Sequence, residues 1–324
     1  MNFRKSLIQA VTAAALTVAG STVQAADEVN VGYFLEWATP NQVAKVLKTY
    51  DDEMGVPVNW TNFDAGTQMT EAMLSGDIDI SFSQGLAPFI NAVNANAPIK
   101  LVAIAVQYPA NDCFVANGAG IDSSNASELE GTTVAVPLAT MADYSFRMMM
   151  RALDVDVSTI TVVDQLPADG AVSLADGSVT MACSFGGIAD AKNAENGVRL
   201  MTSEQKDAAG IISFDVVSVT EKFMQESPDL LETFLDVTDA ANTSFGDTED
   251  ELLVIASDAG MSVEDTRAQM ATMTFPSAKE QLEKYFNDNG LASAAIAVVG
   301  NAFATAENPA LEDYSVAIDT SFLK

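Results

Sequence analysis

The side chains that could do chemistry in this chain are carboxylates, aromatic rings and hydroxyls, because the chain contains no histidine. It therefore has no Ser-His-Asp triad, no imidazole metal ligand and no imidazole acid–base pair. One segment after an apolar run carries Glu36 and Trp37, and a later apolar run contains Asp215 between Phe214 and Val216. A buried carboxylate needs a partner, so Asp215 is a candidate ligand-binding residue.

Two other segments could hold an anion through their backbone amides. Gly85, Leu86 and Ala87 follow the third apolar run, and Thr140 opens a later helix. Helix starts present unpaired N–H groups to an anion. These segments contain no Lys or Arg, whereas carboxylates and rings, including Phe185, suit an ammonium group. The pattern predicts a small zwitterionic ligand.

Most of these residues also have a purely structural interpretation, which the sequence leaves open. Glu36 could favour a helix dipole, Trp37 could pack in the core, and Gly85 could serve an ordinary strand-to-helix turn. Asp64 and Asp143 fit the cap and first turn of helices better than a ligand contact. Asp215 is the hardest of them to explain by structure alone.

The charge balance excludes one class of partner. The chain has 45 acidic and 15 basic residues, a formal net charge of −30, and 48% hydrophobic residues. Such a surface repels nucleic acid, while the hydrophobic content is that of a folded protein. The composition predicts a folded protein that binds no nucleic acid, and we expect neither a cofactor nor a bound metal.

Residues 1–25 have the pattern of a secretory signal peptide. Arg4 and Lys5 precede a mostly apolar run from Leu7 to Ala19, and cleavage after Ala25 fits the small residues there. The run is too short to span a bilayer, which takes about 20 residues. We expect a soluble exported protein, most simply periplasmic.

Cys113 and Cys183 are the two cysteines of the chain. In an oxidising compartment such a pair favours a disulfide, and two thiolates without histidine make a poor zinc site. A bridge closing a loop of about 70 residues stabilises by roughly 4 kcal/mol in the chain-entropy model. Two buried free thiols are the alternative.

Strand and helix patterns alternate twice along the chain and are followed by a helical tail. This order predicts an α/β fold with two lobes, each a mainly parallel sheet flanked by helices. The long apolar runs around Val106 and Val217 are the predicted crossovers between lobes. Lobe 1 is then discontinuous, 26–110 plus 211–324, and lobe 2 is 111–210. The expected strands lie at 29–34, 56–63, 78–82, 99–106, 113–116, 132–136, 161–163, 179–183 and 211–219, and the expected helices at 40–54, 67–75, 87–94, 141–153, 168–174 and 187–193.

From about residue 29 to residue 322 the chain resembles the taurine-binding periplasmic proteins of ABC transporters. Their wider superfamily binds alkanesulfonates, nitrate-like anions and pyrimidine precursors of thiamine. The order and spacing of the matching segments hold along the whole mature chain. They are Phe63-Asp64-Ala65-Gly66, Ser75-Gly76-Asp77-Ile78-Asp79-Ile80, Val134-Ala135-Val136-Pro137, Asp143-Tyr144-Ser145, Gly177-Ser178-Val179, Phe214-Asp215-Val216-Val217 and Tyr314-Ser315.

The resemblance implies a type II periplasmic binding protein fold, a ligand between the lobes and no catalysis. A taurine-like ligand would place its amino group against Asp215 and Glu36, and its sulfonate against Gly85-Leu86-Ala87 and Thr140. The partner implied is an ABC permease in the inner membrane, and we expect a monomer. The chain departs from the family pattern where Leu86 and Ala87 replace paired serines, where Met141 and Ala142 follow Thr140, and where Phe185 replaces a Trp.

Two alternatives stay open at this stage. Glu36, Trp37 and Phe185 could form the site of a receptor for a cationic amine or a thiamine-precursor pyrimidine. More remotely, an exported hydrolase could use a carboxylate pair such as Asp64 and Asp215, although no activated-nucleophile motif is present.

Overall fold

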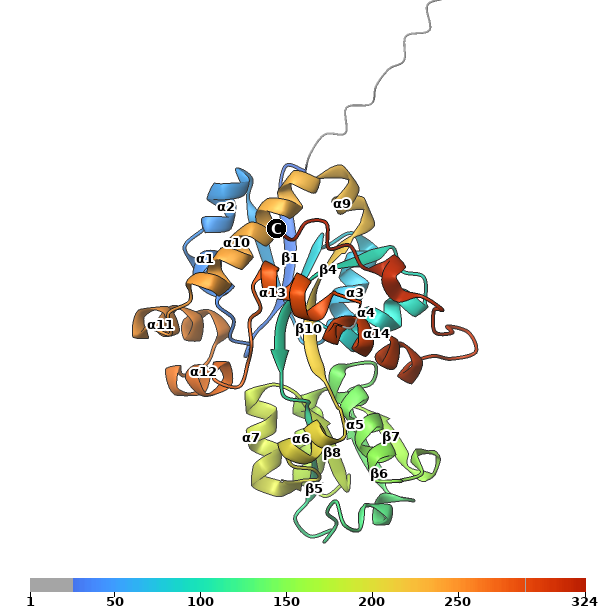
Figure 1. The fold of residues 1–324 in the computed structure, drawn as a ribbon. Coiled ribbons are helices and arrows are strands. Elements are labelled where there is room, and N and C mark those ends of the chain that lie inside the picture. Colours follow the sequence, from blue (N-terminus) through green and yellow to red (C-terminus); the bar gives the residue numbers. More distant parts are fainter. Residues whose placement is uncertain (1–25, 289) are drawn as a thin grey trace, which may run out of the picture.

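The computed structural model describes residues 26–288 and 290–324. The predicted signal peptide, with its cleavage site after Ala25, lies outside the described residues. The described chain builds two five-stranded sheets, each flanked by helices (Figure 1). No helix in this part of the chain is long and apolar enough to cross a membrane.

The first sheet has the order β2-β1-β3-β10-β4. Strands β1, β2 and β3 are parallel, and β10 runs antiparallel to both of its neighbours, β3 and β4. The central strand β3 is buried along its whole length and β10 along all but its last residue, as expected for a sheet with helices on either side. The strands are β1 (Val29–Phe34), β2 (Val58–Phe63), β3 (Ile80–Gly85), β4 (Ile99–Tyr108) and β10 (Ser213–Thr220).

The second sheet has the order β7-β6-β8-β5-β9. Strands β6, β7 and β8 are parallel, whereas β5 pairs antiparallel with β8 and β9. Both sheets are therefore mixed, because in each a strand next to a crossover runs against the βαβ strands. The strands are β5 (Asp112–Ala116), β6 (Thr133–Val136), β7 (Thr161–Asp164), β8 (Met181–Ser184) and β9 (Gly197–Arg199).

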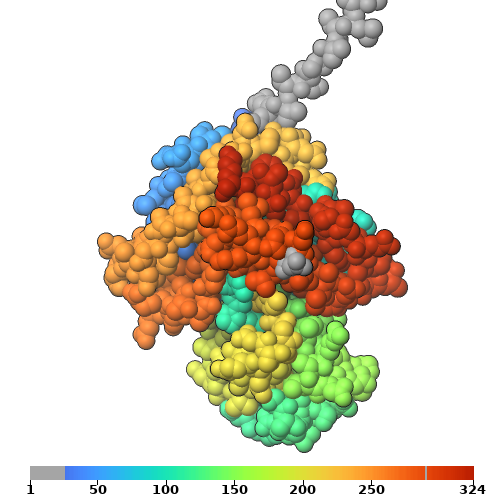
Figure 2. All heavy atoms as spheres, viewed as in Figure 1, coloured from blue at the N-terminus to red at the C-terminus, as the bar shows by residue number. Residues whose placement is uncertain are grey.

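The chain passes between the sheets twice, from β4 to β5 and from α8 to β10, at 109–111 and 209–212. The lobe boundaries predicted from the sequence stay a prediction. We use "first lobe" and "second lobe" for the regions around the first and second sheets. The C-terminal segment covers the first lobe on the face that Figure 2 shows, above the smaller second lobe.

Helices connect the strands and cover the sheets. The predicted helix 40–54 is two helices, because Lys48 has a left-handed backbone, with φ of 64°, and interrupts the ladder. The helices are α1 (Asn41–Val46), α2 (Thr49–Met54), α3 (Gly66–Ser75), α4 (Leu86–Asn94), α5 (Met141–Ala152), α6 (Pro167–Ala175), α7 (Gly187–Asn196), α8 (Ser203–Ala208), α9 (Glu221–Glu226), α10 (Pro228–Ser244), α11 (Glu249–Ala259), α12 (Val263–Met270), α13 (Ala278–Glu280) and α14 (Leu291–Ala302).

One hydrophobic cluster extends across both lobes. It contains Leu86 and Ala87 from the start of α4, and Met141 and Ala142 from the start of α5. All four side chains are at most 4% exposed. The two lobes therefore pack against each other at the starts of these helices.

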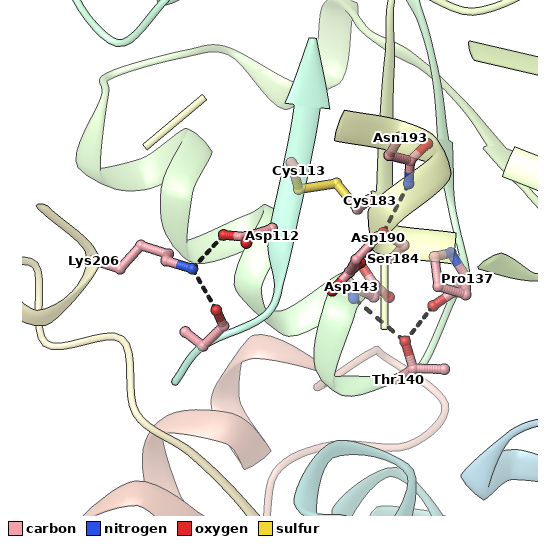
Figure 3. The surroundings of a disulfide bond; sticks show 11 residues. Asp112, Cys113, Pro137, Thr140, Asp143, Cys183, Ser184, Asp190, Asn193 and Lys206 are labelled. Atoms are coloured by element: carbon pink, nitrogen blue, oxygen red, sulfur yellow. Dashed lines mark hydrogen bonds and ion pairs between the residues drawn. A yellow bond between two sulfur atoms is a disulfide. The ribbon is translucent and has the colours of Figure 1, made fainter. Parts of the chain in front are cut away.

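Cys113 and Cys183 form a disulfide, as the sequence predicts, and the alternative of two free thiols is not what the structure shows. The two residues face each other in the antiparallel register of β5 and β8 (Figure 3). The bond thus ties the crossover strand β5 to the centre of the second sheet.

Candidate ligand-binding site

Asp215 is a buried carboxylate whose partners are all neutral. Its side chain is 3% exposed, and it accepts hydrogen bonds from the Tyr108 hydroxyl (2.8 Å, to Oδ1) and the Ser83 hydroxyl (3.1 Å, to Oδ2). Burial raises the pKa of Asp215 to about 7, although both hydroxyls lower it. Burial, and secondarily the charge of Asp215, raises the pKa of Tyr108 well above its usual value, so this hydroxyl stays neutral. When it is ionised, Asp215 thus carries a charge that no side chain of the described residues neutralises.

The sheet positions these groups. Asp215 lies on β10 opposite Gly85 of β3 and Val106 of β4, and the pairing with β3 shifts between Val216 and Ser218. Ser83 has a left-handed backbone with φ of 64°, which is strained for a residue with a side chain. Its hydroxyl also accepts a hydrogen bond from the indole Nε1 of Trp37 (2.8 Å). An irregular strand thereby brings Trp37, Ser83 and Asp215 into one chain of hydrogen bonds.

A cavity of about 50 Å³ adjoins Asp215 and has an aromatic lining. The rings of Trp37 and Tyr108 meet edge to face with centroids 4.9 Å apart. Rings attract a cation through their negative faces. The lining residues are Phe34, Trp37, Gly66, Gly85, Pro88, Tyr108, Asn111, Thr140, Met141, Phe185 and Asp215.

A cleft of about 820 Å³ adjoins this cavity, and Trp37, Tyr108 and Asn111 line both. Its lining includes two basic residues, Arg199 and Lys206, both of which pair with Asp112 at 2.5 Å. Three more carboxyl groups line the cleft, from Glu36, Asp190 and Asp265. Burial raises the pKa of Asp190 to about 6. Acidic groups thus outnumber basic ones in the cleft.

The predicted anion-binding amides at the start of α4 are covered by protein. The Ala87 N–H donates to the thioether sulfur of Met141 across the lobes (3.2 Å). Leu86 is 1% exposed and Ala87 is fully buried. A Cβ at Gly85 would lie 2.9 Å from Met141 Cγ, so glycine lets this side chain approach closely. Met141 occupies the place where a sulfonate was predicted.

Protein groups also satisfy the start of α5 (Figure 3). The Thr140 hydroxyl donates to the Pro137 carbonyl (2.6 Å) and accepts from the Asp143 N–H at 3.5 Å. The Asp143 carboxylate accepts from the Ala139 N–H (2.9 Å) and pairs with Arg147 (2.7 Å). Thr140 is thus a helix cap, and a buried carboxylate already lies where an anion would bind.

Glu36 reaches across the cleft to the start of α7. The Ile188 N–H donates to Glu36 Oε2 at 3.3 Å, and no side chain of α7 caps this end. Glu36 has a left-handed backbone, with φ of 56°, and its own carbonyl accepts from Gln269. This carboxylate joins the lobes by capping a helix in the second.

The structure brings five of the eight predicted ligand-binding residues around one cavity, and separates three from it. Trp37, Gly85, Thr140, Phe185 and Asp215 line the small cavity; Glu36 lines the larger cleft; Leu86 and Ala87 line neither.

The prediction from sequence did not include seven residues of this site, which are unremarkable in type and join it through the fold. Six line the small cavity, namely Phe34, Gly66, Pro88, Tyr108, Asn111 and Met141, and the seventh is Ser83, which donates to Asp215. Only for Tyr108 does the sequence contain a signal, because it ends the apolar run predicted to cross between the lobes.

Comparisons with known proteins place this geometry in a family. The taurine-binding periplasmic protein of Escherichia coli (strain K12) is 26% identical over 199 residues. The match covers 61% of this chain and 60% of that protein, so the chain spans three fifths of that relative's length.

Solved structures share the fold. The alkanesulfonate-binding protein SsuA from Xanthomonas axonopodis pv. citri, bound to MOPS, has a TM-score of 0.69 at 16% identity, over 91% of this chain and 99% of that one. The periplasmic nitrate-binding protein NrtA from Synechocystis PCC 6803 has a TM-score of 0.62 at 13% identity, over 84% and 85%. The predicted α/β fold of a periplasmic binding protein is confirmed. The NMT1/THI5-like family profile matches residues 39–246, so the chain belongs to the NMT1/THI5-like family.

Proposed function

We propose that this protein is the solute-binding component of an ABC importer and binds a small solute through an ammonium group. The observation that carries the proposal is the buried Asp215 carboxylate, which has only neutral hydroxyl partners and adjoins a cavity lined by rings. An ammonium group would supply the missing charge and stack against the rings. The lobes would close around the solute by a hinge at the two crossovers.

Two solute classes meet this requirement. Taurine or a closely related small aminosulfonate is supported by the relative from E. coli, whose name states taurine binding. A cationic amine or a thiamine-precursor pyrimidine without a sulfonate is supported by Met141, which holds the Ala87 N–H that the sulfonate would need. Both classes present an ammonium or a comparable cation to Asp215.

The remaining parts of the proposal follow from the relatives. Removal of the predicted signal peptide would release the protein into the periplasm, where the closed lobes present a joint surface to an ABC permease in the inner membrane. The relatives' names describe binding proteins, so we infer binding without turnover, and we propose that the protein acts as a monomer.

The test is calorimetric titration of the mature protein with taurine, ethylamine, propylamine and phenethylamine. We expect at least one of them to bind 1:1. We expect Asp215→Asn to weaken that binding about 30-fold or more, because truncating one partner of a buried charge pair costs about 2–5 kcal/mol. Asp52→Asn is the matched control, since it removes an exposed carboxylate on α2. Equal affinity in Asp215→Asn and wild type would contradict the proposal.

A further inference from the structure

Resting on the proposed function, we propose that the ligand is an organic cation with a primary ammonium group and no sulfonate or carboxylate. We further propose that Met141 is the residue that excludes the acidic group. The site would thus hold the cationic half of a zwitterion and reject the acidic half.

First, a protein acceptor already holds one backbone N–H at or next to each of the three helix starts around the small cavity and the cleft. The Met141 sulfur accepts from Ala87 at the start of α4. The Asp143 and Glu36 carboxylates occupy the starts of α5 and α7. A sulfonate brought to Glu36 would meet a like charge, and at α5 it would have to compete with the ion pair of Asp143 and Arg147. At α4 it would have to displace a thioether whose residue, Met141, is 4% exposed.

Second, the cation end is left incomplete by the protein. Asp215 has no charged partner among residues 26–288 and 290–324, and its two neutral donors leave carboxylate lone pairs free. The side-chain oxygen of Asn111 is buried and accepts no hydrogen bond from any described residue, although Asn111 lines both cavities. A primary ammonium has three N–H donors, and it could serve Asp215 and Asn111 together while the rings contact its charge.

Third, the spaces around the small cavity are acidic. In the larger cleft four carboxyl residues, Glu36, Asp112, Asp190 and Asp265, face two basic ones, and both basic ones already pair with Asp112. A groove of about 520 Å³ on the other side of Thr140 is lined by Asp164 and Asp169 and by no basic residue among those described. Both spaces favour a cation and disfavour an anion.

The sizes of the cavities indicate the shape of this cation. The cavity of about 50 Å³ beside Asp215 has room for an ammonium group and little more, whereas the adjoining cleft of about 820 Å³ can hold an organic body. The side chains of Ile188, Met261 and Met273 give that cleft apolar surface. The ligand would therefore insert its ammonium group and leave a neutral body in the cleft.

Matched ligand pairs test the proposal. Ethylamine and taurine differ only in the sulfonate, as do propylamine and 3-aminopropanesulfonate. We expect each amine to bind wild type at least tenfold more tightly than its sulfonate partner in calorimetric titrations at pH 7.5. We expect phenethylamine to bind more tightly than ethylamine because its ring can enter the cleft.

Variants at Met141 test the cause of the selection. Met141→Ala frees the Ala87 N–H and opens space beside Gly85, so taurine binding should gain tenfold or more. Met141→Leu is the matched control, because it keeps the apolar volume; it should gain nothing. Thermal melting of both variants shows whether they are folded.

The outcomes separate the two proposals. Sulfonates that bind wild type as tightly as their amines, or more tightly, would overturn the present inference while leaving the proposed function intact. Taurine affinity unchanged in folded Met141→Ala would overturn the role of Met141. Binding of neither member of either pair, nor of phenethylamine, would overturn the proposed function and this inference with it.

Discussion

The two ends of the candidate site are built on opposite principles. Around Asp215 the protein buries a charge and surrounds it with neutral hydroxyls and rings. At or beside the helix starts, Met141, Asp143 and Glu36 each accept a hydrogen bond from one backbone N–H. A buried charge without a counterion is costly, whereas a satisfied donor is not. The incomplete end is therefore where a ligand has most to contribute.

The contrast shows that a shared fold does not by itself determine which ligand is bound. The chain shares its fold with structures whose names specify alkanesulfonate and nitrate binding. In this chain the side chain that follows Thr140, Met141, covers the start of α4. Ligand chemistry thus depends on single residues placed on a common scaffold.

The largest effect we predict is on the pH dependence of stability in the ligand-free protein. Because the pKa of Asp215 rises from 3.8 to about 7 on folding, its favourable contribution is present below pH 4 and is lost as pH rises through 7. Between pH 4 and 8 the unfolding free energy of Asp215→Asn should gain about 4 kcal/mol relative to wild type. Urea unfolding at several pH values measures this difference. If the difference in unfolding free energy between Asp215→Asn and wild type did not change with pH, burial would not raise the pKa of Asp215.

The next effect is on ligand affinity. An amine stays protonated from pH 5.5 to 7.5, so protonation of Asp215 should weaken binding of the tightest amine about 25-fold over this range. Asp52→Asn, which removes an exposed carboxylate on α2 outside the site, is the control and should keep the same profile. A flat wild-type profile in calorimetric titrations would remove Asp215 from the ligand contact.

The sequence predicts the strands that carry the site better than it predicts the hydrogen bonds within the site. Apolar periodicity located nearly every strand, and a carboxylate inside the apolar run around Val216 indicated Asp215. A sequence pattern could not predict which helix-start N–H groups are already hydrogen-bonded to protein. Met141 contacts the Ala87 N–H across the lobes, and this contact depends on how the lobes pack. The mixed sheets, the break at Lys48 and the left-handed Ser83 likewise depend on tertiary contacts that a local pattern does not contain.

A smaller effect should follow from removing one donor at the cation end. Tyr108→Phe keeps the ring against Trp37 but removes a hydrogen bond that lowers the pKa of Asp215. We expect amine affinity to fall about fivefold at pH 7, where more Asp215 is then protonated, and to recover at pH 8.5. Titrations at the two pH values distinguish this from a packing defect, which would weaken binding equally at both.

The smallest effect on affinity should come from the helix-start end. Thr140→Val keeps the shape of the side chain but removes the hydroxyl that caps α5, whereas Thr140→Ser keeps the hydroxyl. Loss of the cap should lower the unfolding free energy by about 1 kcal/mol in Thr140→Val only. Amine affinity should change less than twofold in both variants, because Thr140 serves the helix and its hydroxyl contacts no cation. A tenfold loss of affinity in Thr140→Val alone would show that the hydroxyl binds the ligand. The helix-start end would then contribute to ligand binding, as the Asp215 end does.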